Sequence, residues 1–345
     1  MYRGDHTETG QFIICLTRKI INGKQEREMS EIASALKNWI PFRLSQEKEE
    51  NVCQWLYTAD KTFDEPFFDE TISKCRQLKE NSQQCKAVSS LSVLPEWAPL
   101  LNCVPPKAII FHVSRCGSTL LSQLLSLDPA NIALSEVPFF DDLLRHGFRN
   151  NSLPEMLPVV KAAISFHGVK KNEKQQRLYI KADSWHIHFY DQWRQLYPAV
   201  PVILLYRRPD EVIRSHRQHR GMQAVQGVIE PSLFGFGPEI FTLPLDEYMA
   251  RVLETFFIAF EKILRADKNV LAVNYNEGML TVMNKIASFT GISYTEEVML
   301  QMKERLGYHA KFPGQVFEEA PLNAAIPAYQ KAVFELYKEL DSLRK

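Results

Sequence analysis

The sequence predicts an α/β fold: a doubly wound parallel sheet in a three-layer arrangement with helices, preceded by an N-terminal α+β segment. From residue 107 onward, short apolar runs alternate with stretches that have the apolar spacing of helices. Val, Ile and Leu dominate these runs with little polar alternation, which is typical of strands buried on both faces. The five predicted strands are residues 108–113, 132–134, 178–180, 200–206 and 270–273.

Helical patterns fill the intervals between these runs and continue to the end of the sequence. Ligands in sheets of this kind bind at the carboxyl ends of the strands. The turn after the first strand, Glu136, Lys181 and Arg207 all fall at predicted strand ends, so we expect the functional site there. The predicted helices are residues 119–127, 157–166, 188–196, 209–218, 245 to about 265, and 327–343.

The first hundred residues do not show the alternation of apolar runs and helical patterns that is seen from residue 107 onward. A strand is expected at residues 11–21, and helices are expected at residues 28–39 and 68–79. Pro95, Pro99, Pro105 and Pro106 then precede the first strand of the parallel sheet. The sequence therefore predicts an accessory segment at residues 1–100 and the main domain at residues 101–345.

Composition excludes several classes of function. Of the 345 residues, 45% are hydrophobic and 24% are charged, and the formal net charge is zero, which gives no support to a nucleic-acid partner. No run of about 18 apolar residues predicts a membrane span, and the N-terminus lacks the apolar core of a secretory signal. We therefore expect a cytoplasmic protein with free thiols. Its six scattered cysteines are Cys15, Cys53, Cys75, Cys85, Cys103 and Cys116.

Residues 107–121 have the pattern of a buried strand, a tight polar turn and the start of a helix. Ser118 and Thr119 are expected to cap that helix, whose N-terminus would attract an anion of the phosphate type. A standard ATP-binding P-loop has glycine and lysine where this chain has His112 and Ser118. The nearest cation is Arg115. The turn therefore indicates an anionic nucleotide other than the usual magnesium-bound triphosphate.

A second anion site is predicted after the fourth strand. Arg207 follows the strand, Pro209 suits the first position of a helix, and Ser215 lies two turns further along it. An arginine fork and a helix hydroxyl in this arrangement can clamp one phosphate. Two separate anion sites in one α/β crevice suggest a nucleotide with phosphates at both ends.

Both motifs resemble those of the P-loop sulfotransferase superfamily, over roughly residues 107–312. Arg115-Cys-Gly-Ser-Thr119 is similar to the loop that binds the 5′-phosphosulfate of the donor, 3′-phosphoadenosine 5′-phosphosulfate (PAPS). Arg207, Pro209 and Ser215 match the motif for its 3′-phosphate in type and spacing. The resemblance implies a sulfotransferase-type fold, PAPS as donor and no metal. The donor-binding residues that it implies are Arg115, Cys116, Gly117, Ser118, Thr119, Arg207, Ser215 and, on a poor match to a closing loop, Lys311.

The resemblance also implies catalytic residues. Glu136, in Ser135-Glu-Val-Pro-Phe-Phe-Asp141, is similar to the catalytic base of heparan sulfate 3-O-sulfotransferases and of some bacterial carbohydrate sulfotransferases. Lys181 matches a lysine that, like Arg115, is expected to stabilise charge at the transferring group. The cytosolic sulfotransferases have a histidine base two residues after that lysine, and here Asp183 stands in its place. Asp183 and His186 therefore remain alternative bases.

The predicted activity is transfer of a sulfuryl group from PAPS to a hydroxyl of a small-molecule or carbohydrate acceptor. The alternatives are a divergent P-loop kinase and a non-catalytic nucleotide-binding protein. Residues 1–100 are expected to cover the acceptor site or to mediate a homodimer. A basic cluster either receives an anionic acceptor or is a solvated helix face; it comprises Arg207, Arg208, Arg214, Arg217, Arg220, His216 and His219.

Overall fold

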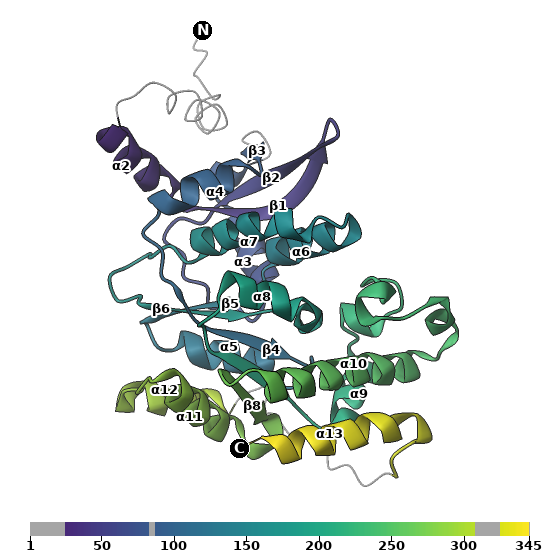
Figure 1. The fold of residues 1–345 in the computed structure, drawn as a ribbon. Helices are drawn as coiled ribbons and strands as arrows, with labels where there is room; N and C mark the ends of the chain where they lie inside the picture. Colours follow the sequence, from purple (N-terminus) through teal and green to yellow (C-terminus); the bar gives the residue numbers. More distant parts are fainter. Residues whose placement is uncertain (1–24, 83–86, 308–324, 345) are drawn as a thin grey trace. The chain divides into compact units, whose positions relative to one another are not determined.

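The computed structural model describes residues 25–82, 87–307 and 325–344 (Figure 1). The chain divides into two compact units that alternate along the sequence. The first unit comprises Met1–Pro106 and Pro129–Leu178, and the second comprises Lys107–Asp128 and Tyr179–Lys345. The strand expected at residues 11–21 lies outside the described residues.

The first unit contains an antiparallel sheet in the order β1-β2-β3, made of β1 (Trp39–Glu47), β2 (Glu50–Tyr57) and β3 (Val88–Ser90). The β1–β2 hairpin pairs Trp39 with Tyr57 and closes through Lys48 and Glu49. These two turn residues have φ of 48° and 70°, the left-handed conformation that a tight hairpin turn requires. The hairpin was not predicted, because neither turn residue is Gly or Asn and Pro41 interrupts β1.

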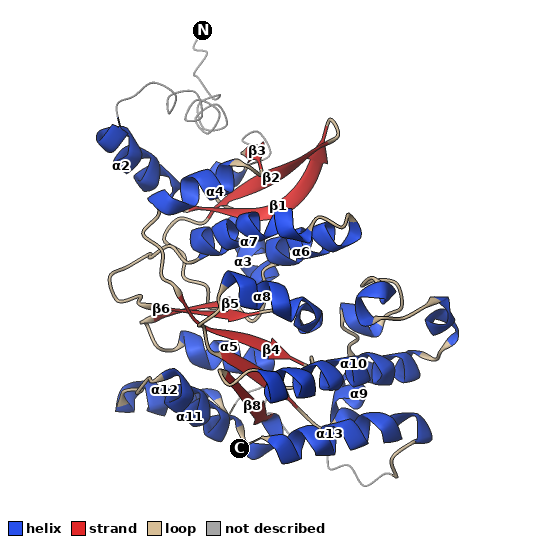
Figure 2. Cartoon of the chain, in the orientation of Figure 1, coloured by secondary structure: helices blue, strands red, loops and turns tan. Residues whose placement is uncertain are grey.

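The described residues of the first unit contain the α-helices α2 (Gln25–Leu36), α3 (Phe68–Cys75), α4 (Val93–Trp97), α6 (Pro138–Arg149) and α7 (Leu153–His167). Helices α6 and α7 pack against each other and against β1 (Figure 2). Aromatic side chains form the core: the Trp55 ring lies 6.0 Å from that of Trp97 and 4.9 Å from that of Phe166. Burial of these large rings stabilises the sheet against the helices.

A buried carboxylate links the segment before α3 to the helix. The Glu65 side chain, 2% exposed, contacts Lys61 at 2.5 Å and Lys74 at 3.0 Å. It also accepts a hydrogen bond from the Thr71 hydroxyl at 2.6 Å. Burial acts to raise the pKa of Glu65, but these three partners outweigh it and lower the pKa to about 2.

Glu65→Gln is therefore expected to lower the free energy of unfolding at neutral pH by roughly 2 kcal/mol, since solvent around Lys74 screens part of the pairing. The folded-state pKa lies below the ordinary value of 4.5, so this stability is present above pH 4.5 and is lost as pH falls toward 2. Denaturation at several pH values should show wild type and variant converging in acid. Asp64→Asn, at a 63% exposed neighbour, is the control. A gap that stays constant with pH would contradict this account.

The parallel sheet has the order β5-β6-β4-β7-β8. It is made of β4 (Pro106–His112), β5 (Asn131–Ser135), β6 (Arg177–Lys181), β7 (Val202–Tyr206) and β8 (Val270–Asn274). In the second unit β4 pairs with β7 through Ile109 and Val202, and β7 pairs with β8 through Ile203 and Leu271. Every residue of β7 is buried, as its unbroken apolar run predicts. The predicted α/β class and all five predicted strands are confirmed.

The helices of the second unit form two packed groups. One contains α5 (Ser118–Ser126) and α11 (Met279–Thr290), and the other contains α9 (Pro209–Gln218), α10 (Leu245–Ala266) and α13 (Lys331–Leu343). Helices α8 (Tyr190–Leu196) and α12 (Glu296–Arg305) also belong to this unit. The sequence did not predict α6 in the first unit, nor α11 and α12 in the second. Pro138 looks like a helix breaker in the sequence but occupies the first turn of α6, where proline is tolerated.

The sequence predicts free thiols and no membrane-spanning segment. Cys53, Cys75, Cys103 and Cys116 are free thiols, and Cys15 and Cys85 fall outside the described residues. Within the described part of the chain, no helix combines the length and the apolar character needed to cross a bilayer.

Candidate functional site

The loop between β4 and α5 has an unusual backbone. Ser114 and Arg115 have φ of 63° and 49°, and Gly117 has φ of 81°. Left-handed conformations cost about 1–3 kcal/mol at residues other than glycine and are concentrated at functional sites. The amide of Ser114 donates to Nδ1 of His112 at 3.1 Å, which holds the start of the loop against the strand. The strain therefore falls on the segment that the sequence predicts to bind an anion.

Gly117 is the N-cap residue of α5, and neither Ser118 nor Thr119 caps the helix, which corrects the expectation from the sequence. A Cβ atom at Gly117 would lie 2.4 Å from Cδ2 of Tyr275, so the loop requires glycine there. The first intrahelical bond runs from the Leu121 amide to the Gly117 carbonyl. The amides of the preceding turn are thus at the helix N-terminus, the usual setting for anion binding.

Cys116 is fully buried, and its thiol contacts the Leu205 carbonyl at 3.5 Å. Burial raises the pKa of Cys116 to about 12, so the side chain is a neutral thiol at physiological pH. Its side chain packs in the core, and only its backbone is suited to contact a ligand in the loop.

Arg207 follows β7 directly, and Pro209 occupies the first turn of α9, as predicted. The Arg207 residue is 7% exposed. Its Nε donates to Oε2 of Glu211 at 2.6 Å, and its guanidinium lies 4.5 Å from the centroid of the Tyr275 ring. Its Nη1 also donates to the carbonyl of Arg115 at 3.3 Å. The predicted phosphate-binding arginine is therefore fixed by contacts with the helix, the loop and the segment after β8.

Glu211 and the segment after β8 were not predicted as parts of the site. The Asn276 amide donates to Oε2 of Glu211 at 3.0 Å. Burial acts to raise the pKa of Glu211, but hydrogen bonds from Asn276 and Arg207 lower it below its ordinary value. Two features of the sequence could have pointed to these parts of the site. They are a glutamate four residues after Arg207 and the Asn274–Glu277 capping box after the last strand.

Arg115 connects the two predicted anion sites. Its Nε donates to the Ser215 hydroxyl at 2.9 Å, and its Nη2 donates to the Ser215 carbonyl at 3.3 Å. Burial and the positive charge of Arg207 lower the pKa of Arg115. The sequence predicts separate sites for these residues, whereas in the structure a direct hydrogen bond joins one motif to the other.

Lys181, the last residue of β6, is 1% exposed. Asp183 precedes a short 3-10 helix (Ser184–Phe189), and its Oδ2 lies 3.6 Å from Nε2 of His186. Burial lowers the pKa of His188 to about 4, and His188 packs on Phe256. His188 therefore has a structural role, whereas Asp183 and His186 form a pair close to Lys181 in sequence.

Glu136 belongs to the first unit, where it follows β5 and precedes α6. Its φ of 54° is left-handed, as at Ser114 and Arg115. The hydroxyl of the preceding residue, Ser135, donates to the Pro66 carbonyl at 3.3 Å and fixes the end of the strand. Glu136 thus has a strained backbone at a strand end, the position at which the sequence predicts functional residues.

The basic cluster, which lies before, on and after α9, is largely offset by acidic residues. Arg208 contacts Asp210 at 3.0 Å, and Asp246 contacts both Arg217 at 2.6 Å and Arg220 at 3.0 Å. This pairing favours the solvated-face interpretation over binding of an anionic acceptor. Lys311, the donor-binding candidate in the expected closing loop, lies outside the described residues.

No protein-family model matches the sequence, and no curated protein matches it. Solved structures to which the chain is similar include several sulfotransferases. A sulfotransferase domain from the curacin biosynthetic pathway has 15% identity and a TM-score of 0.44, covering 69% of this chain and 99% of that one. A Mycobacterium avium sulfotransferase has 14% identity and a TM-score of 0.43, covering 99% and 96%. A mouse sulfotransferase complexed with PAP has 12% identity and a TM-score of 0.34, covering 87% and 93%.

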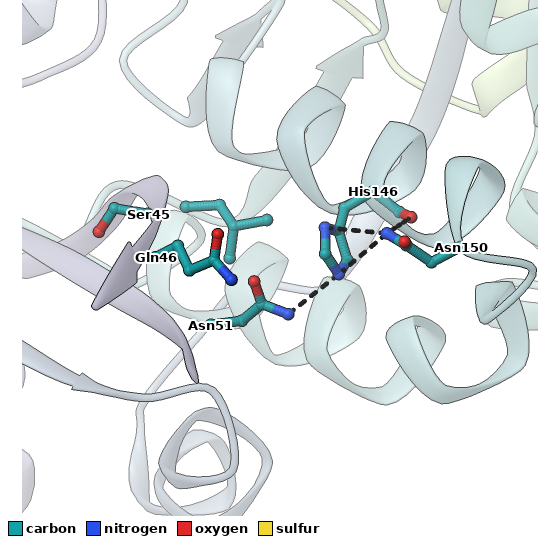
Figure 3. A pocket seen from close by; sticks show the side chains of 6 residues that line it. Ser45, Gln46, Asn51, His146 and Asn150 are labelled. Atoms are coloured by element: carbon teal, nitrogen blue, oxygen red, sulfur yellow. Dashed lines mark hydrogen bonds between the residues drawn. The ribbon is translucent and has the colours of Figure 1, made fainter. Parts of the chain in front are cut away.

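The first unit contains an open polar cavity of about 590 Å³ between the β1–β2 hairpin and α6 (Figure 3). The Asn51 amide lies 3.0 Å from Nε2 of His146, and the Asn150 amide donates to the His146 carbonyl at 2.8 Å. Burial and the charge of Arg149 lower the pKa of His146, which favours the neutral imidazole. The cavity was not predicted from the sequence. Its lining residues are Leu44, Ser45, Gln46, Asn51, His146 and Asn150.

Proposed function

We propose that this protein is a sulfotransferase that moves a sulfuryl group from PAPS to the hydroxyl of a small-molecule or carbohydrate acceptor. The observation that carries the proposal is the direct link between the two anion-binding motifs through Arg115 and Ser215. The loop lacks the lysine of ATP-binding P-loops, and it is joined to the clamp formed by Arg207 and Ser215. This combination suits a nucleotide with phosphates on both its 3′ and 5′ oxygens.

In this proposal, the amides of Gly117, Ser118 and Thr119 bind the 5′-phosphosulfate at the N-terminus of α5. Arg207 and Ser215 bind the 3′-phosphate, and Glu211 fixes the arginine fork in position. The backbone of Cys116 belongs to the same loop. The low exposure and multiple contacts of Arg207 support this assignment, because a fixed fork loses little freedom on binding.

The proposed chemistry is an in-line displacement at sulfur. The acceptor oxygen forms a bond to sulfur as the bond between sulfur and the bridging phosphate oxygen breaks, and Glu136 takes the acceptor proton. The products are a sulfate ester and adenosine 3′,5′-bisphosphate. Lys181 is proposed to stabilise charge on the transferring group. Asp183 and His186 are the alternative bases, and residues 1–100 are proposed to form an accessory segment that serves the acceptor site or a homodimer.

Activity without magnesium distinguishes this proposal from a divergent kinase. The protein is incubated with PAPS, labelled on the sulfuryl group, and a panel of hydroxyl-bearing small molecules and sugars in the presence of EDTA. We expect transfer of label to at least one acceptor, whereas a kinase requires divalent metal for phosphoryl transfer. Phosphorylation that appears only with ATP and magnesium would contradict the proposal. Nucleotide binding without transfer to any acceptor would favour the non-catalytic alternative.

A further inference from the structure

The side chain of Arg115 extends from the loop to α9. The two hydrogen bonds to Ser215 join residues one hundred positions apart in the sequence, and both come from the guanidinium. Because the Ser215 hydroxyl accepts the bond from Nε, its own hydrogen is not used in that contact and is suited to donate to an anion. Arg115 and Ser215 thus present donors side by side.

Arg115 and Arg207 are held together in spite of their like charges. Nη1 of Arg207 donates to the carbonyl of Arg115, so the backbone of one arginine fixes the other. Glu211 supplies one negative charge against the two guanidinium groups. The three side chains therefore keep a net positive charge in a largely buried setting, where an added anion gains more than at an exposed surface.

We infer that Arg115 binds the 3′-phosphate of the nucleotide together with Ser215 and Arg207, and does not act on its 5′ end. The inference rests on the proposed function and departs from the sequence resemblance, which implies that the loop arginine binds the 5′-phosphosulfate and stabilises charge at the transferring group. The 5′ end is then left to the amides at the start of α5 and to Lys181. Arg115 becomes a residue that selects donors carrying a 3′-phosphate.

Calorimetric titration of three nucleotides tests this assignment: adenosine 3′,5′-bisphosphate, adenosine 3′-monophosphate and adenosine 5′-monophosphate. Arg115→Met is expected to weaken binding of both nucleotides with a 3′-phosphate by about 10–100-fold, because it removes charge-assisted hydrogen bonds to that group. Binding of adenosine 5′-monophosphate is expected to stay within about twofold of wild type. Arg217→Met, the same change at a 53% exposed side chain on α9, is the matched control and is expected to alter none of the three affinities.

A double-mutant cycle with Ser215→Ala gives a second test that needs only the bisphosphate. If Arg115 and Ser215 bind one phosphate, the double variant should lose less affinity than the product of the two single losses. Additive losses, or equal weakening of the bisphosphate and the 5′-monophosphate, would overturn the inference while leaving the proposed function intact. Absence of bisphosphate binding by the wild type would overturn both.

Discussion

Replacing Glu136 by glutamine is expected to lower kcat by about 10²–10⁴-fold, the usual contribution of a positioned general base. Glutamine has nearly the same shape but cannot accept the acceptor proton. The affinity for adenosine 3′,5′-bisphosphate should remain unchanged, because Glu136 is not proposed to contact the donor. Single-turnover transfer and calorimetry, measured on the same preparation, separate the two effects.

Three further variants make the Glu136 experiment specific. Asp183→Asn and His186→Gln test the alternative bases, which form a 3.6 Å pair after β6. Glu155→Gln changes a carboxylate in the first turn of α7 and is expected to leave kcat unaltered. Wild-type turnover in Glu136→Gln, with a large loss in Asp183→Asn or His186→Gln, would transfer the role of base to that pair.

Arg207→Met is expected to weaken binding of adenosine 3′,5′-bisphosphate by about 10²–10³-fold, since charge-assisted hydrogen bonds from the guanidinium to the 3′-phosphate are lost. It should also lower the free energy of unfolding by about 2 kcal/mol, because Glu211 would lose its 2.6 Å contact with Arg207 and keep only the 3.9 Å contact with Arg208. Calorimetry measures the first effect, and denaturant unfolding measures the second.

The double variant Arg207→Met/Glu211→Gln separates these two effects. Glutamine removes the carboxylate charge and keeps a hydrogen-bonding group near Asn276, so most of the lost stability should return. Bisphosphate affinity should remain low, because the guanidinium is still missing. If affinity recovered together with stability, Arg207 would be a structural residue, and the 3′-phosphate site would need other donors.

The parallel sheet was predictable because its strands are unbroken apolar runs, and β7 is buried along its whole length. The N-terminal hairpin was not, since Lys48 and Glu49 adopt a turn that usually contains Asn or Gly. Pro41 also lies inside β1, at an irregularity in the pairing with β2, where the sequence alone argues against a strand. Local patterns therefore predicted the main sheet but not the accessory one.

In the candidate site, the sequence identified residues by type and spacing but not their partners. Nothing in the spacing of Arg115 and Ser215 shows that their side chains meet, because the contact depends on how α9 packs near the loop. Tyr275 packs against Gly117 and against the guanidinium of Arg207, from a segment whose only signal in the sequence is the Asn274–Glu277 capping box. Such contacts between distant segments appear only once the fold brings β4, β7 and β8 together.

The proposed function requires this chain to bind a nucleotide with phosphates at both its 3′ and 5′ positions without metal. Titration of the wild-type protein with adenosine 3′,5′-bisphosphate in EDTA tests it most directly. We predict saturable binding that is at least about tenfold tighter than binding of adenosine 5′-monophosphate, because the second phosphate adds charge-assisted contacts with arginine. Absence of bisphosphate binding, or binding only of ATP with magnesium, would contradict the account.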